Sequence, residues 1–302
     1  MRAEVEFRAE DGVTLRGWKY VPDIPPNKPA PAIVMINGFS GVKETLTQYA
    51  QAFQAEGFAV LLYDHRNFGA SDGQPRLHIE PSRQLADLRC AVTVLRGFPE
   101  VDPERIGMWG TSLAGGHAIV TAANDRRIKC VVSQIPFISG HRSAERFYTV
   151  HRLTELRQMF DDDRQNRLHG EPSAMLPVVS DSEDFCCLPS PVSKRFVQAS
   201  IDQAAAWRNE VTIGSLENLF EYEPGALIKF VSPTPLLMIV GARDNVCFPD
   251  LAFEAYENAL EPKSLYIHRA GHWGTYFPPY LDATAYEACK WFKEHLITRM
   301  EK

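Results

Sequence analysis

Apolar residues recur along this chain in two alternating patterns: short continuous runs, and longer stretches with an apolar residue every three or four positions. The short runs are rich in Val, Ile and Leu and have the length of buried strands, whereas the longer stretches have the period of amphipathic helices. We expect strands at residues 5–8, 13–21, 32–36, 58–64, 105–109, 128–136, 235–240 and 264–268, and helices at about 43–56, 82–95, 113–123, 250–260 and 283–298. This alternation predicts an α/β fold with a mostly parallel eight-stranded sheet and helices on both faces.

The alternation stops between residues 141 and 230. That stretch is mainly helical, polar and irregular, and the strand-helix rhythm resumes directly after it. A helical block placed between two strands of one sheet is typical of an inserted cap. We therefore predict that residues 1–140 and 231–302 form one catalytic core and that residues 141–230 form a helical cap insertion.

Charge and composition exclude several classes of protein. The 302 residues carry a formal net charge of −6 and no long basic run, so a nucleic-acid partner is not expected. No apolar stretch approaches the roughly 20 residues that a membrane span needs, and the charged N-terminus does not resemble a secretory signal. The six cysteines include no C-x-x-C pair, which favours reduced thiols in a cytoplasmic protein. The oligomeric state stays open.

The segment Gly110-Thr111-Ser112-Leu113-Ala114-Gly115 stands between a predicted strand and a predicted helix. A serine at such a sharp turn projects its hydroxyl above the sheet, and the bend requires small residues two positions before and after it. Ala114 stands where glycine is commoner, which the backbone tolerates if φ is negative there. We predict that Ser112 is a nucleophile, which then needs a base to take its proton.

A serine of this kind requires an acid and then a histidine later in the chain. Asp244 directly follows the strand after the cap, and His272 lies in the loop after the last strand. Loops at the carboxyl ends of parallel strands open on the same rim, so these side chains can meet Ser112 there. We predict that Asp244 orients His272 and that His272 is the base. Asp250 is the rival acid, but its position favours the N-cap of a helix.

The developing oxyanion requires backbone N–H donors. One should come from the residue after the nucleophile, Leu113, and another from the loop after the third strand. In that loop, at residues 37–41, Phe39 is our candidate donor.

Taken together, these motifs resemble those of the α/β-hydrolase superfamily over nearly the whole chain outside the cap. The loop Asn37-Gly38-Phe39 resembles the family's His-Gly-Phe with Asn in place of His, and residues 63–73 resemble its D-x-R-G-x-G-x-S segment with Asn67 in place of Gly. The resemblance implies that Asp64 and Arg66 are structural and pin a loop beside the nucleophile. The order of elements is similar to that of dienelactone-hydrolase-like and thioesterase-like members with a helical cap.

The predicted function is a serine hydrolase that cleaves a carboxylic ester or thioester through an acyl-enzyme on Ser112. No metal or organic cofactor is implied, and a small-molecule substrate with substantial apolar surface is expected because a cap covers the site. The resemblance leaves open an acyltransferase that passes a polyketide-type acyl group to an alcohol. Further alternatives are a C–C bond hydrolase and a non-catalytic module that binds a small ligand.

Three other groups of residues could suggest a functional site, but we expect each of them to have an ordinary structural role. Cys186 and Cys187 have no metal-ligand spacing and are expected to pack as free thiols. His117 follows Ser112 on the same predicted helix and is expected to pack against the sheet. The run Asp161-Asp162-Asp163 is typical of a solvated turn.

Overall fold

The computed structural model contains a central eight-stranded sheet, and it describes the chain except for residues 24, 26–27, 181–184, 190–201, 203 and 299–302. The strand order is β1-β2-β4-β3-β5-β6-β9-β10. Strands β1 and β2 are antiparallel to their neighbours, and the other six strands, β4, β3, β5, β6, β9 and β10, run parallel to one another. The strands are β1 (Arg2–Arg8), β2 (Thr14–Tyr20), β3 (Ala30–Ile36), β4 (Ala59–Tyr63), β5 (Val101–Thr111), β6 (Ile128–Gln134), β9 (Leu236–Gly241) and β10 (Lys263–His268). The predicted fold class is confirmed.

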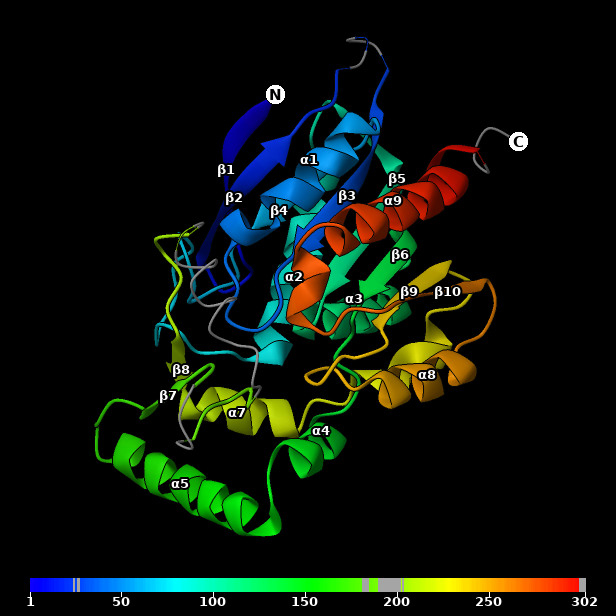
Figure 1. The fold of residues 1–302 in the computed structure, drawn as a ribbon. Coiled ribbons are helices and arrows are strands. Elements are labelled where there is room, and N and C mark those ends of the chain that lie inside the picture. Colours follow the sequence, from blue (N-terminus) through cyan, green and yellow to red (C-terminus); the bar gives the residue numbers. More distant parts are fainter. Residues whose placement is uncertain (24, 26–27, 181–184, 190–201, 203, 299–302) are drawn as a thin grey trace.

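Helices cover both faces of this sheet (Figure 1). Because successive side chains of a strand point to opposite faces, Ile33 and Met35 of β3 pack in one apolar cluster and Val34 and Ile36 in the other. The first cluster contains residues of α1 (Thr47–Ala55) and α9 (Tyr280–Lys293), and the second contains residues of α2 (Pro81–Arg96), α3 (Leu113–Asn124) and α8 (Pro249–Asn258). Strand β3 is buried along its whole length, as expected for a strand covered on both faces.

Short helical turns extend two of these helices. A 3₁₀ turn, η1 (Lys43–Leu46), precedes α1, and a π-helical turn, η4 (Glu294–Thr298), follows α9. Gly57 has φ 92° just after α1, a left-handed conformation that commonly ends helices. None of the described helices combines the length and the apolar character that crossing a membrane requires.

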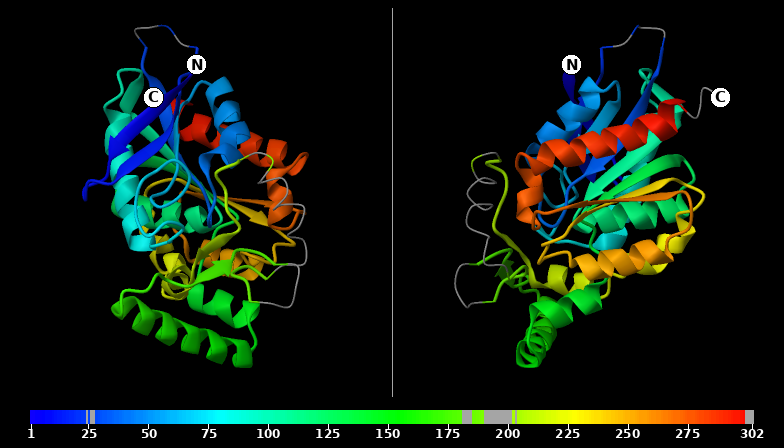
Figure 2. Two further views of the ribbon diagram at one scale, coloured as in Figure 1. Left: turned by 90° about the vertical axis from the view of Figure 1, so that its left-hand side faces the viewer. Right: turned by 45° about the vertical axis from the view of Figure 1, so that its right-hand side comes forward.

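The segment between β6 and β9 lies beyond the carboxyl ends of the parallel strands, at the end of the molecule away from the N-terminus (Figures 1 and 2). A large apolar cluster joins it to the core, with Leu156 and Leu216 from the segment and Leu113 and Trp273 from the core. Its described elements are α4 (Gly140–Phe147), α5 (Val150–Leu168), β7 (Met175–Pro177), β8 (Glu210–Thr212), α7 (Ile213–Phe220) and η2 (Pro224–Phe230). The division into a core and a cap at residues 141–230 remains a prediction.

The turn expected at the acidic run of residues 161–163 is wrong, because this run lies inside helix α5. Leu156, Phe160 and Asp163 form the buried stripe of that helix, at the spacing of one helix face. The Asp163 carboxylate accepts hydrogen bonds from Ser173 Oγ at 3.0 Å and from the Ala174 backbone N–H at 2.7 Å. A carboxylate thus replaces an apolar residue on the inner face and holds the chain that leaves the helix.

Candidate active site

Ser112 stands at a strained turn between β5 and α3. Its backbone has φ 59° and ψ −124°, outside the regions that non-glycine residues normally occupy. The Ser112 N–H donates to Gln134 O at 2.9 Å, so strand β6 holds the turn. A Cβ on Gly110 would lie 2.0 Å from Ala114 O, and only glycine therefore fits there. Ala114 lies within α3 and is not among the residues with positive φ.

Asp244 and His272 meet in the loops after β9 and β10. The distance between His272 Nδ1 and Asp244 Oδ2 is 2.8 Å, and the side chains are 2% and 0% exposed. The other oxygen, Asp244 Oδ1, accepts from the backbone N–H groups of Val246 and Cys247, each at 2.8 Å. The two amides fix the carboxylate, and a fixed carboxylate holds the imidazole in one orientation with Nδ1 as the donor.

Ser112 and His272 line the same cavity, although no hydrogen bond joins them in the described part of the chain. The Ser112 hydroxyl instead contacts the Sγ atom of Cys247 at 3.8 Å. Burial raises the pKa of the Cys247 thiol well above its usual range. The thiol is therefore protonated at neutral pH, and as a thiol it is a poor rival nucleophile.

The loop after β3 packs directly against the serine. A Cβ on Gly38 would lie 2.9 Å from Ser112 Cβ, so only glycine allows this approach. The backbone N–H groups of Phe39 and Leu113 have no hydrogen-bond acceptor among the described residues, and both residues line the cavity around Ser112. Two unpaired donors beside a serine hydroxyl are the arrangement that binds an oxyanion.

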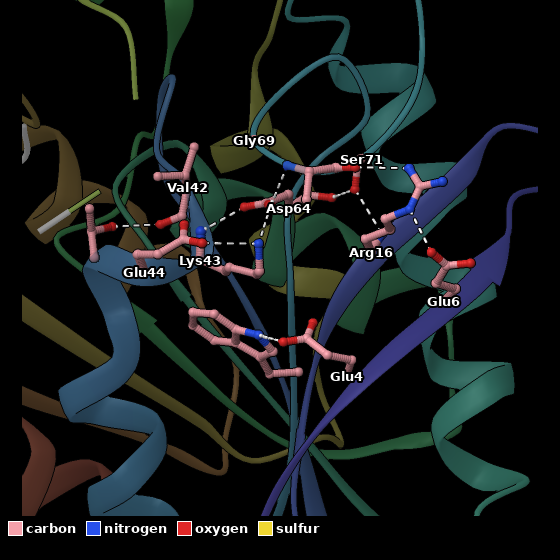
Figure 3. A network of polar contacts seen from close by, with 12 residues as sticks. Glu4, Glu6, Arg16, Val42, Lys43, Glu44, Asp64, Gly69 and Ser71 are labelled. Atoms are coloured by element: carbon pink, nitrogen blue, oxygen red, sulfur yellow. Dashed lines mark hydrogen bonds and ion pairs between the residues drawn. The ribbon is translucent and has the colours of Figure 1, made fainter. Parts of the chain in front are cut away.

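A buried ion pair connects this loop to the segment after β4 (Figure 3). Lys43 donates to the Asp64 carboxylate twice, from its backbone N–H to Oδ1 and from Nζ to Oδ2, each at 2.7 Å. The Ala70 N–H donates to Oδ2 at 2.8 Å. A Cβ on Gly69 would lie 2.3 Å from that oxygen. Asp64 thus ties the start of η1, just after the loop that packs against the serine, to the segment after β4. This supports the structural role implied by the resemblance.

Replacing Asp64 by alanine is expected to lower the free energy of unfolding by about 3–5 kcal/mol, because it leaves the buried Lys43 ammonium without its main counter-charge. Urea unfolding measures this loss. Glu104→Ala is the control, since it removes an exposed partner of Arg96 and should change the free energy of unfolding by less than about 1 kcal/mol. Equal losses in the two variants would contradict the proposed role of the buried pair.

Comparison with known proteins places the chain in a family. A family model described as X-Pro dipeptidyl-peptidase (S15 family) matches residues 11–274. The chain belongs to this family. It is 31% identical over 281 residues to thiohydrolase aneE of Aspergillus aculeatus, covering 90% of this chain and 86% of the relative. It is 33% identical to polyketide transferase ATR5 of Stachybotrys chlorohalonatus, covering 90% of each.

A solved structure shows the wider superfamily. The α/β-hydrolase GrgF from Penicillium sp. sh18 superposes with a TM-score of 0.84 at 27% identity, covering 98% of this chain and 99% of GrgF. The resemblance to the α/β-hydrolase superfamily is therefore confirmed.

The rival acid of this S15-family chain, Asp250, pairs with an arginine, whereas the imidazole pairs with Asp244. It stands in the first turn of α8, and its exposed carboxylate pairs with Arg146. The residue in the N-cap position is Phe248, so the expected capping role of Asp250 is wrong. Arg146 comes from α4, and the pair therefore ties α4 to the core.

The sequence did not indicate the hydrogen bonds that two buried histidines make. His117 Nδ1 lies 2.8 Å from Tyr222 Oη, and its Nε2 lies 2.9 Å from Gln84 Oε1. His65 Nε2 lies 3.1 Å from Asn37 O. Burial lowers the pKa of both histidines, that of His65 to about 4. Both imidazoles are thus neutral at physiological pH, and His117 makes specific bonds in addition to packing against the sheet. Cys186 and Cys187 are buried and free.

Proposed function

We propose that this protein is a serine hydrolase that cleaves a carboxylic ester or thioester through an acyl-enzyme on Ser112. The 2.8 Å hydrogen bond between Asp244 and His272, together with a cavity that both His272 and Ser112 line, carries the proposal. A carboxylate that fixes an imidazole beside a serine at a strand-to-helix turn is the arrangement that activates a hydroxyl nucleophile.

In the proposed reaction, His272 Nε2 takes the proton of the Ser112 hydroxyl as Oγ attacks the carbonyl carbon. The Phe39 and Leu113 N–H groups stabilise the oxyanion, and His272 returns the proton to the leaving oxygen or sulfur. A water molecule, deprotonated by His272, then hydrolyses the acyl-enzyme. Before the first step Oγ must leave Cys247 and face Nε2, and rotation about χ1 of Ser112 is the simplest such motion.

The relatives support acyl chemistry in two forms. One is named a thiohydrolase and another a polyketide transferase. Both outcomes follow from the same acyl-enzyme, which water or an alcohol can attack. Acyl transfer to an alcohol is therefore the second candidate function.

Peptide hydrolysis, which the family name denotes, has less support in the cavity. A peptidase that removes dipeptides must bind the charged amino terminus of its substrate, and a carboxylate is the natural partner for that ammonium. No Asp or Glu is among the described residues that line the cavity at Ser112. An ester or thioester with an apolar acyl group fits this lining better.

A series of p-nitrophenyl esters tests the substrate class. We expect kcat/KM to rise from acetate toward longer acyl chains, because apolar side chains surround Ser112 on the cap side and each buried methylene contributes about 0.8 kcal/mol. An X-Pro p-nitroanilide should be cleaved far more slowly. Best turnover of acetate with a steady decline for longer acyl groups, or preference for the anilide, would contradict the proposal. Product analysis with competing alcohols separates hydrolysis from acyl transfer.

A further inference from the structure

A short helical turn follows His272 directly and carries a side chain back to the nucleophile. This 3₁₀ turn, η3 (Trp273–Tyr276), has His272 in its N-cap position. From the end of the turn, the Tyr276 hydroxyl lies 2.9 Å from Thr111 Oγ1. Thr111 is buried and immediately precedes Ser112. One hydrogen bond between two hydroxyls therefore joins the segment of the base to the turn of the nucleophile.

A second and longer connection through buried side chains joins the same two segments. The Tyr49 hydroxyl, from α1, donates to Thr275 O in η3 at 3.2 Å. Gln134 of β6 donates from Nε2 to the Tyr49 hydroxyl at 3.1 Å, and its backbone carbonyl accepts the Ser112 N–H. This longer connection holds η3 against the core without Tyr276, so loss of the Tyr276 hydroxyl should shift η3 and not unfold it.

The tilt of the His272 imidazole depends on η3. The hydrogen bond from Nδ1 to Asp244 fixes one atom of the ring and leaves its tilt to the side chains that pack against it. The rings of Trp273 and Tyr276 make T-shaped contacts with the imidazole, at centroid distances of 4.9 Å and 6.2 Å. A shift of Tyr276 therefore moves one of the surfaces against which the imidazole rests.

The proposed reaction is sensitive to such a shift. Proton transfer requires Ser112 Oγ and His272 Nε2 to come within about 3.2 Å of each other, and a displacement of about 1 Å can lower a rate about 100-fold. We propose that Tyr276 is a positioning residue, whose hydrogen bond to Thr111 holds the imidazole where it can take the Ser112 proton. This inference rests on the proposed function and assigns one further residue to its first step.

The bond between Tyr276 and Thr111 does not depend on pH near neutrality. Burial raises the pKa of the Tyr276 hydroxyl well above its usual range, and it raises the pKa of Tyr49 to about 12. Both phenols therefore stay protonated at neutral pH and in mild alkali, and the threonine hydroxyl does not titrate. A variant without this bond should lose the same factor in kcat at each pH in this range.

Tyr276→Phe tests the inference, because it removes the hydroxyl and keeps the ring beside His272. We expect kcat for an activated ester to fall about tenfold, the effect of a shift smaller than 1 Å, and KM to change less than twofold. The rate at which a fluorophosphonate labels Ser112 should fall by the same factor. Tyr286→Phe is the control, since Tyr286 is exposed on α9 and its variant should keep the wild-type kcat.

A double-mutant cycle with Thr111 separates positioning from a general loss of packing. Thr111→Val removes the partner hydroxyl at similar side-chain size and should lower kcat about as much as Tyr276→Phe. The double variant should then be no slower than either single variant, because the two changes break one and the same bond. Thr111→Ser keeps the hydroxyl and should retain most of the wild-type kcat. Thr111→Ala takes the place of the valine variant should that variant fail to fold.

The outcomes distinguish this inference from the proposed function. A wild-type kcat in Tyr276→Phe, or losses that multiply in the double variant, would overturn the positioning role while the proposed function stands. A wild-type protein that turns over no ester or thioester and takes up no fluorophosphonate would overturn the proposed function and this inference with it.

Discussion

Replacing Ser112 by alanine is expected to lower kcat/KM for an activated ester by about 10⁴–10⁶-fold, the loss that accompanies removal of a serine nucleophile. The free energy of unfolding should hardly change, because the one hydrogen bond of the hydroxyl to the described residues is the long contact with Cys247 Sγ, and the backbone bonds of the turn remain. Steady-state kinetics and urea unfolding measure the two quantities. Ser82→Ala, at an exposed serine of α2, is the control and should retain wild-type activity.

The contact with Cys247 makes a second variant informative. If the sulfur were the true nucleophile, Ser112→Ala would keep most of its activity and Cys247→Ala would lose it. We expect the opposite order, because burial raises the pKa of the Cys247 thiol and a protonated thiol attacks a carbonyl poorly.

Replacing Asp244 by asparagine is expected to lower kcat by about 10⁴-fold with little change in the shape of the site. The amides of Val246 and Cys247 donate to Oδ1, so the asparagine must keep its oxygen at that position. Its NH₂ group then faces His272 Nδ1, which becomes an acceptor. The proton moves to Nε2, and the imidazole can no longer take the proton of Ser112.

Asp250→Asn separates this effect from a general loss of acidic charge near the cap. The Asp250 carboxylate pairs with Arg146 at the surface, so this variant should lose less than about 1 kcal/mol of stability and keep its activity. Comparable losses of kcat in the two variants would contradict the assigned role of Asp244.

Much of the fold could be predicted from the sequence because buried strands of a parallel sheet are nearly continuous apolar runs. The run at residues 32–36 indicated β3, which is buried along its whole length. The turn predicted at residues 161–163 was wrong because polar residues do not always face solvent. Consecutive acids suggest solvent, and only the packing of α5 shows that one of them faces inward.

The candidate site could be located from the sequence because its residues follow the carboxyl ends of parallel strands, which share one edge of the sheet. That reasoning placed Asp244 and His272 in loops that do lie together. It could not find Cys247 beside Ser112, since a contact between side chains 135 residues apart depends on loop conformation. Nor could it show that Tyr222 of the segment after β6 bonds to His117 of α3.

Covalent labelling tests the central claim, that His272 activates Ser112 as the nucleophile, most directly. The protein is incubated with a fluorophosphonate, digested and mapped by mass spectrometry, with His272→Ala treated in parallel. We expect one adduct on the Ser112 hydroxyl in the wild-type protein and almost none in the variant. An unlabelled wild-type protein, an adduct on another residue, or equal labelling of the variant would contradict the claim.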